Sequence, residues 1–549
     1  MRTFVALYLL ALIVRAAMVA LYPDAAYNDA YYYADVARAL AAGHGFNVDF
    51  VWVFAEVGNH IPANPTLPVP SNAHWLPLSS VLQAPFLVLF GPVGWASAIP
   101  MVLIGSLTAP LTLVIARDAG MSRTVGLGAA ILAAVPAMGT VFMPQPENFA
   151  ILQPLVAATI LCVVKGLKGD PRFYALAGVL VGFASLARND GFVLGATVGL
   201  TFIIDRARAL WSRGARPPRL PLWSGFACFG LYLLVMSPWW TRQLATFGSI
   251  SPTASSGAAL WLRNMAEWNS ITANPNPAQF FAQGWPAILE SRFLGLVAAI
   301  GNFAVIDGSV VLVPLIVAGA WIYRHRVEFQ PWILQAFLVF AAATIIYPVH
   351  VPGGAFIHSA IGLESHAYIL ALAAIESIVI AIARRRPAWK PSQAVPVFVG
   401  AAVAFVVATA PVYALAVVQT WRDSAAPRLK LAAEMDSLGV KPDDRLLTID
   451  AAGFKYWTGR PGVVTPDDPI ETIEAVARAY QTRWMILERG DIATALGPVL
   501  AGQQKLPWVG IPVFVVPARD GGVPRLAMFP VCVTPADDRC AGPSILATR

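Results

Sequence analysis

The feature that most constrains this chain is a series of apolar segments, most of them about as long as a membrane-spanning helix. A bilayer core of ~30 Å takes about 20 apolar helical residues. The sequence is 57% hydrophobic and only 13% charged over 549 residues, a balance that excludes a soluble globular domain. We therefore predict an all-α polytopic membrane bundle of about 11 spans. The predicted spans are residues 3–21, 95–116, 124–142, 149–164, 173–187, 192–204, 222–240, 293–323, 331–349, 361–383 and 394–418.

The basic residues between these segments indicate how the bundle is oriented. If the N-terminus is cytoplasmic, every clear basic cluster between spans lies inside, as the positive-inside rule requires. Residues 75–90 are also apolar, but counting them as a span would place those clusters outside, so we interpret them as a helix lying in the membrane interface. Residues 3–21 lack a small-residue cleavage site, so we expect them to remain as the first span. The net charge of +7 follows from this orientation, and no nucleic-acid motif is present.

This orientation places two long polar segments and the C-terminal tail outside. The tail alternates strand-like and helix-like segments, which predicts a small α/β domain. The strand-like segments are 445–449, 484–488 and 512–516, and the helix-like ones are 428–438 and 470–480. We predict a membrane domain, 1–418, with outer loops 22–94 and 241–292, and an extracytoplasmic domain, 419–549. The composition suggests a plasma (inner) membrane, and Cys532 and Cys540 would form a disulfide if the tail faces an oxidising compartment.

A polar, aromatic-rich stretch, DAAYNDAYYYADVARALAAGHGF, follows the first apolar segment at residues 24–46. Asn28 and Asp29 lie where a helix cap belongs, and Gly43 and Gly45 would end the helix. Between them, helical spacing is shown by Tyr32, Tyr33, Val36 and Leu40. We expect an amphipathic helix on the membrane with a carboxylate at its start. Asp29 could serve chemistry there, or it could only cap the helix.

Two further acidic residues lie on the predicted outer side. Glu147, in the short turn 143–148, could act in chemistry or could simply be solvated. Arg188 and Asp190 lie between segments of about 15 and 13 residues, which are too short for a bilayer core of ~30 Å. A recessed turn would bring both charges into a pocket, and charges at membrane depth are functional candidates. The alternative is an ordinary Asn-Asp-Gly turn whose two charges neutralise each other.

Two arginines complete the candidate set. Arg15 lies inside the first apolar segment, where a guanidinium needs a partner. Arg242 follows a Pro-Trp-Trp sequence and could also anchor its helix at the interface. With the outer acids, these residues suit transfer of a group from a lipid phosphate, because arginine binds phosphate through a planar fork and one carboxylate can deprotonate an incoming hydroxyl.

Metal binding is a weaker signal. His44, His60 and His74 share the first outer segment, but their spacing matches no HExxH-like motif. If the protein uses a divalent cation, we expect oxygen ligands between Asp29 and Glu147.

The order of these motifs resembles that of GT-C glycosyltransferases that use polyprenyl-phosphate sugars, such as the protein O-mannosyltransferases, the lipid A aminoarabinose transferases and the mycobacterial arabinosyltransferases. The first outer loop, the second interfacial helix, the proline-tryptophan motif and a glycine-rich loop each have a counterpart. The matching residues are 29–33, 37–40, 43–45, 74–78, 237–242 and 353–354. Two positions depart from the pattern: Ala30 stands where many relatives have a second acid, and Gln243 replaces an asparagine.

The resemblance implies a GT-C bundle that moves a sugar from a polyprenyl-phosphate donor, with inversion, to an extracytoplasmic acceptor glycan, lipid or protein. It implies that Asp29 is the catalytic carboxylate and that Glu147 takes the place of the second outer-loop acid. The side chains expected to bind substrate are Arg15, Tyr32, His74, Arg188, Asp190 and Arg242.

Two other functions remain open from the sequence alone. A transporter or flippase of a lipid-linked intermediate would place charged residues on several spans at mid-membrane, whereas here the acids gather at the outer face. A non-catalytic scaffold fits the tail but leaves the charged turn at Arg188 and Asp190 unexplained.

Overall fold

The structure is a computed structural model that describes residues 1–52, 60–211, 217–249, 260–346, 355–386, 388–533 and 538–540. The chain forms two compact units. The first contains Met1–Asp24, Leu76–Ala245 and Trp285–Val418, and the second contains Ala25–Trp75, Thr246–Gly284 and Gln419–Arg549. The glycine pair at 353–354 lies outside the described residues.

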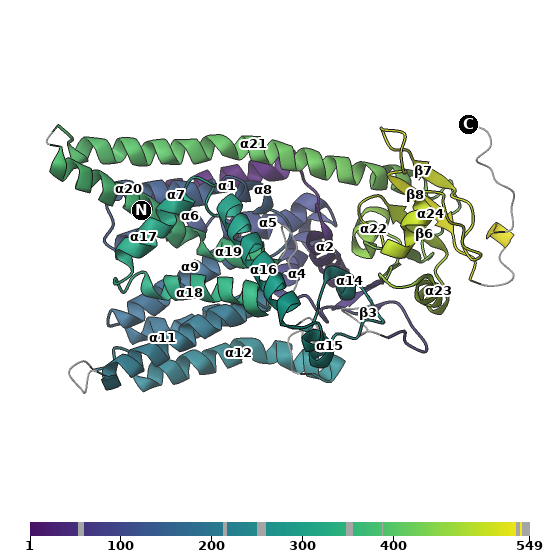
Figure 1. Ribbon diagram of the computed structural model, residues 1–549, viewed down its shortest axis with the longest axis horizontal. Coiled ribbons are helices and arrows are strands. Elements are labelled where there is room, and N and C mark those ends of the chain that lie inside the picture. The colour runs from purple at the N-terminus through teal and green to yellow at the C-terminus, as the bar shows by residue number, and fades with distance from the viewer. Residues whose placement is uncertain are drawn as a thin grey trace. The chain divides into compact units, whose positions relative to one another are not determined.

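The first unit is helical throughout its described parts, and Figure 1 shows, for example, α11 and α18 running side by side. Its helices are α1 (Arg2–Leu21), α4 (Leu78–Phe90), α5 (Gly94–Gly105), α6 (Thr108–Asp118), α7 (Arg123–Ala134), α8 (Gly139–Phe142), α9 (Phe149–Leu167), α10 (Pro171–Ala187), α11 (Gly191–Trp211), α12 (Leu222–Phe247), α16 (Trp285–Ile306), α17 (Val313–Tyr323), α18 (Gln330–Ala341), the π-helix η1 (Ala342–Ile346), α19 (Ala355–Ala360), the 3₁₀ turn η2 (Ile361–Leu363), α20 (Glu364–Arg385) and α21 (Pro391–Glu434). The unit boundaries fall inside α12 and α21.

Seven helical segments among the described residues are long and apolar enough to cross a membrane. The chain is therefore a multi-pass membrane protein. The seven are Arg2–Leu21, Gly94–Asp118, Phe149–Leu167, Leu222–Phe247, Trp285–Ile306, Phe356–Arg385 and Pro391–Glu434. Shorter apolar helices, such as α7 and α10, account for other predicted spans, and the count of 11 stays a prediction.

Small residues let several of these helices pack at close range. A Cβ on Gly178 of α10 would overlap the backbone carbonyl of Cys228 on α12, and one on Gly319 of α17 would overlap the carbonyl of Leu370 on α20. In a membrane, such close backbone approach is a main source of helix association, because lipid gives helices little hydrophobic reason to pair.

Three predicted segments differ from the observed helices. The predicted span 293–323 is two helices, since positive φ angles at Ser309 and Val310 turn the chain between α16 and α17. The predicted segment 192–204 is too short: α11 continues through Asp205, which accepts a hydrogen bond from the Leu220 N–H at 3.0 Å. The separate helix predicted at 428–438 is instead the end of α21.

The second unit is built on a six-stranded sheet of order β2-β5-β4-β6-β8-β7, with an additional antiparallel pair, β1 and β3. The strands β2, β5, β4 and β6 run parallel, whereas β8 is antiparallel to both β6 and β7. The strands are β1 (Asn47–Val48), β2 (Phe50–Val51), β3 (Val69–Pro70), β4 (Leu446–Thr448), β5 (Gly462–Val464), β6 (Trp484–Glu488), β7 (Phe514–Val516) and β8 (Leu526–Pro530), and the helices are α2 (Asn28–Ala41), α14 (Met265–Trp268), α15 (Pro277–Ala282), α22 (Ala451–Thr458), α23 (Ile470–Ala479) and α24 (Gly497–Leu500), with 3₁₀ turns η3 (Thr494–Leu496) and η4 (Asp538–Cys540).

Both faces of this sheet are covered, as the alternation along β6 requires. Met485 and Leu487 pack in a core with Ile473 and Val476 of α23. Trp484 and Ile486 point to the opposite face, into a second core that also takes in residues of α21 and α22. A parallel strand buried on both faces is expected to be apolar along its whole length, which β6 is up to Glu488.

The last segment of the second unit, Gln419–Arg549, has the bounds of the predicted C-terminal domain. The unit also takes in residues 25–75 and 246–284, which the sequence analysis assigned to the membrane domain as outer loops. The reason is direct strand pairing, because Phe50 and Val51 of β2 pair with Gly462 and Val463 of β5. Near the C-terminus, Cys532 and Cys540 form a disulfide.

Candidate active site

Asp29 lies in the first turn of α2, in the second unit. The predicted capping role of Asp29 is wrong, because the N-cap is Tyr27, two positions earlier, in an extended conformation. Instead, the Trp75 indole N–H donates to Asp29 Oδ1 at 2.9 Å. The helix ends as predicted, with Gly43 in the left-handed region at a φ of 80°. Asp29 is therefore a first-turn carboxylate whose orientation is set by an indole.

Trp75 is itself held by aromatic neighbours. Its ring stacks on Tyr32 with a centroid distance of 4.1 Å, and the Tyr32 hydroxyl accepts a hydrogen bond from the Asn72 N–H at 2.7 Å. His74 packs edge-on to Trp75 at 5.0 Å and to Trp268 at 4.9 Å. The predicted substrate residues Tyr32 and His74 thus lie in the aromatic cluster that supports Asp29.

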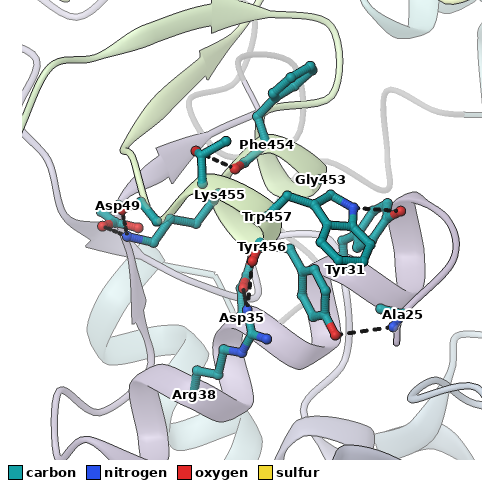
Figure 2. Close-up of polar contacts among 12 residues, drawn as sticks. Ala25, Tyr31, Asp35, Arg38, Asp49, Gly453, Phe454, Lys455, Tyr456 and Trp457 are labelled. Carbon is teal, nitrogen blue, oxygen red and sulfur yellow. Dashed lines mark hydrogen bonds and ion pairs between the residues drawn. The ribbon is translucent and has the colours of Figure 1, made fainter. Parts of the chain in front are cut away.

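Polar and ring contacts join α2 to α22 within the same unit (Figure 2). The Tyr456 hydroxyl accepts a hydrogen bond from the Ala25 N–H at 3.2 Å, and the Tyr456 carbonyl accepts one from Arg38 at 3.2 Å. The Arg38 guanidinium also lies 3.9 Å from the centre of the Tyr456 ring, a cation–π arrangement. The segment just before the helix that carries Asp29, and the last turn of that helix, are therefore both held to α22.

Asp35 of α2 forms an ion pair with Arg38, three residues further along the helix, at 3.2 Å. Asp35 is buried, and this burial raises its pKa to about 7, although the charges of Arg38 and Lys455 act in the opposite direction. Ionisation of Asp35 in the folded chain therefore costs free energy that the pair with Arg38 only partly offsets.

Glu147 belongs to the first unit, in the turn between α8 and α9, and is fully buried. Its Oε2 lies 3.3 Å from Nδ1 of His358 on α19. The His358 ring stacks on Phe149 with a centroid distance of 4.3 Å. The sequence alternative of a solvated Glu147 is therefore wrong. The sequence analysis missed His358; its one signal was a lone histidine within an apolar run.

Arg188 and Asp190 form an ion pair of 2.6 Å in the turn between α10 and α11. Their side chains are only 18% and 16% exposed, so the pair is largely withdrawn from solvent. A Cβ on the neighbouring Gly191 would overlap the backbone of Ser185, so this turn folds tightly onto α10. Arg188 also interacts electrostatically with His358, which groups this turn with Glu147.

Arg15 is buried in the first unit, where it closes the end of a helix. Its guanidinium donates to the carbonyls of Ala133 and Ala134, at 3.4 and 3.3 Å. These are the last carbonyls of α7, which lack helical partners, and a cation there also complements the helix dipole. With 1% of its surface exposed, Arg15 holds α1 to α7.

Arg242 lies near the end of α12, with its guanidinium 5.1 Å from the centre of the Trp239 ring. It donates to the side-chain oxygen of Gln243 at 2.6 Å. Gln243 is fully buried, so the glutamine that departs from the family pattern fixes the arginine beside it.

The predicted site residues thus divide between the units. Asp29, Tyr32 and His74 belong to the second unit. The first unit contains Arg15, Glu147, Arg188, Asp190 and Arg242.

Comparison with known proteins relates residues 71–241 to a family described as dolichyl-phosphate-mannose-protein mannosyltransferase. No curated protein matches the sequence. Among solved structures, ArnT of Cupriavidus metallidurans bound to undecaprenyl phosphate is similar with a TM-score of 0.54 at 16% identity, over 99% of both chains. The oligosaccharyltransferase AglB of Archaeoglobus fulgidus, in complex with an inhibitory peptide and a dolichol-phosphate, is similar with a TM-score of 0.52 at 13% identity, over 88% of this chain and 69% of that one.

Proposed function

This chain has the GT-C fold, and on that premise we propose that it is an integral membrane glycosyltransferase. The reaction would move a sugar from a polyprenyl phosphate to a hydroxyl group of an extracytoplasmic acceptor. The observation that carries the proposal is the full-length similarity to ArnT, a protein crystallised with undecaprenyl phosphate. AglB, whose structure is in complex with a dolichol-phosphate, adds a second structure with the same lipid chemistry.

Asp29 would act as the general base. Its carboxylate would take the proton of the acceptor hydroxyl while that oxygen attacks the anomeric carbon of the sugar. The bond from that carbon to the phosphate oxygen would break, and the phosphate would leave with the electron pair. A direct displacement of this kind inverts the configuration at the sugar carbon. The hydrogen bond from Trp75 supports this role, because it holds the base in one orientation.

Arg188 and Arg242 would bind the lipid phosphate and stabilise its growing charge. Both are half-buried and already oriented, Arg188 by Asp190 and Arg242 by Gln243. We assign Arg15 a structural role, because its guanidinium already donates hydrogen bonds to the last carbonyls of α7.

The expected divalent cation stays a prediction. In the first unit, Glu147 and His358 offer a carboxylate oxygen and an imidazole nitrogen 3.3 Å apart. Two ligands at about 2.1 Å from a tetrahedral metal lie roughly 3.4 Å apart, so this pair has a spacing that a metal can use. Metal analysis of the purified protein, with Glu147→Gln as the comparison, tests this prediction without an activity assay.

The proposal is tested by incubating the purified full chain in nanodiscs with undecaprenyl and dolichyl phosphates that carry radiolabelled hexoses or pentoses. We expect transfer of label to an acceptor, and loss of transfer in Asp29→Asn. Asp443→Asn, an exposed aspartate of the same unit, is the matched control and should transfer normally.

Two outcomes would contradict the proposal. Near-normal transfer by correctly folded Asp29→Asn would remove the assigned base. Movement of the labelled lipid across the bilayer without any transfer would favour the transporter or flippase alternative.

A further inference from the structure

The second unit contains a cavity of about 670 Å³, built from the start of α2, the end of α21 and the loops that follow β6 and β7. All of its lining residues belong to that unit. Its volume is within the range of about 300–1,000 Å³ that is usual for small-molecule sites. Asn28 lines it, and Asn28 is the neighbour of Asp29 in the first turn of α2.

The buried wall of the cavity is an ion network centred on Arg428. Its guanidinium binds Glu488 through both Nε, at 3.0 Å, and Nη2, at 2.6 Å, and it also binds Asp450. Arg428 and Glu488 are each only 8% exposed. Because the planar fork of Arg428 is filled by carboxylates of the same unit, it has little capacity left for an anionic ligand.

Asp491, next to this network, has spare hydrogen-bonding capacity. No described residue donates a hydrogen bond to its carboxylate, although its backbone N–H reaches the Glu488 carbonyl at 3.3 Å. Burial, followed by the nearby charges of Asp450 and Glu488, raises the pKa of Asp491 to about 6. A carboxylate in these surroundings is an acceptor that a ligand hydroxyl can reach.

The other walls supply aromatic rings and paired charges. Tyr27 and Tyr31 line the cavity from α2, and Tyr31 is fixed by a hydrogen bond from the Trp457 indole at 3.2 Å. At the rim, Arg489 pairs with Asp520 at 3.3 Å. Four arginine and four acidic side chains line the cavity, so their charges balance.

The charge balance and the aromatic walls of the cavity favour one class of ligand over others. Balanced charge gives no net attraction for a phosphate or a polycation. Sugar hydroxyls both donate and accept hydrogen bonds, and so can use fixed carboxylates and guanidinium groups side by side. The apolar face of a sugar ring can pack on a tyrosine ring.

We propose that this cavity binds a neutral carbohydrate, and that it is the subsite for the glycan part of the acceptor. Asp491 and Arg489 hydrogen-bond the sugar hydroxyls, and Tyr27 and Tyr31 pack against the ring. That the bound sugar belongs to the acceptor rests on the proposed function, whereas carbohydrate binding in the cavity does not.

The experiment measures saturation-transfer difference NMR signals from methyl glycosides of mannose, galactose and arabinose, with the full chain in nanodiscs. We expect binding by the wild type and by the transfer-deficient Asp29→Asn. Asp491→Asn and Arg489→Gln should each weaken binding about ten- to a hundredfold, the range for losing one hydrogen bond to a charged group. Asp443→Asn should bind as the wild type does. Arg489 is exposed, so this variant reports on the cavity even if Asp491→Asn folds poorly.

The results separate this inference from the proposed function. If wild-type protein transfers sugar but no glycoside binds, or if binding is unchanged in both cavity variants, the inference is overturned and the function stands. Binding that is lost in the cavity variants supports the inference even without detectable transfer. If inorganic phosphate displaces the glycosides from the wild type, the cavity is an anion site and the inference fails.

Discussion

The hydrogen bond from Trp75 to Asp29 makes a specific kinetic prediction. Trp75→Phe removes the indole N–H that lies 2.9 Å from Asp29 Oδ1, but keeps an aromatic ring against Tyr32. The substitution therefore changes the orientation of the proposed base much more than the packing around it.

The size of the effect follows from the type of bond. A hydrogen bond to a charged group contributes about 1.5–3 kcal/mol, which corresponds to roughly ten- to 150-fold. Since α2 still fixes the backbone of Asp29, we expect the lower end, a fall of about tenfold in kcat with little change in the donor KM. Aromatic pairs contribute about 0.5–1.5 kcal/mol, and phenylalanine keeps much of this, so the loss of stability from weaker ring packing should stay below about 1 kcal/mol.

The assay is steady-state transfer from a labelled polyprenyl-phosphate sugar, with Trp52→Phe as the matched control. Trp52 packs on Trp75 in the same aromatic cluster, with ring centroids 4.8 Å apart, but its indole N–H donates to Asn269 and not to Asp29. Equal kcat values for the two variants would refute the reasoning. The double variant Trp75→Phe/Asp29→Asn gives a second test. If its residual rate is again about tenfold below that of Asp29→Asn alone, the reasoning is also refuted, because Trp75 is argued to act only through the Asp29 carboxylate.

Three further predictions concern stability. Arg428→Gln leaves two buried carboxylates without their cation, so the second unit should lose about 3–5 kcal/mol, seen as faster proteolysis of its loops. The raised pKa of Asp35 means that between about pH 4 and 7 the folded chain holds a proton that the unfolded chain releases. The free energy of unfolding should therefore fall by up to about 4 kcal/mol as pH rises through that window. Thermal unfolding of Asp35→Asn should not show this fall. Gly178→Ala should lower the thermal midpoint, because α10 must move away from α12, whereas Gly230→Ala, with open space around it, should not.

Local signals in the sequence were sufficient for α2. The helix and its end were predicted from the helical spacing of Tyr32, Tyr33, Val36 and Leu40 and from Gly43, because helix formation and termination depend on residues within a few positions of each other. The same locality explains the failure at residues 293–323, where hydropathy averaged over a window conceals a turn made by the backbone at Ser309 and Val310.

Long-range partners could not be predicted from local pattern. Phe50 and Val51 form a strand only because β5 lies beside them, and a two-residue strand has no periodicity of its own. His358 meets Glu147 across more than 200 residues, and Trp75 meets Asp29 through a loop whose path the sequence does not specify. The types of residue at the candidate site were predictable, whereas the side chains that orient them required the structure.

The pairing of β2 with β5 also has a consequence for the order of events during synthesis. Phe50 pairs with Gly462, so the N-terminal partner leaves the ribosome 412 residues before the strand that it needs. At about 5–20 residues per second, this delay is roughly 20–80 s. During that interval Phe50 and Val51 have no strand to pair with, so their backbone groups are open to proteases and to wrong partners. If translation ends before residue 462, the segment that carries Asp29 is released without its partner strand. We therefore expect such truncated chains to be degraded by quality control and not to form a partly active enzyme.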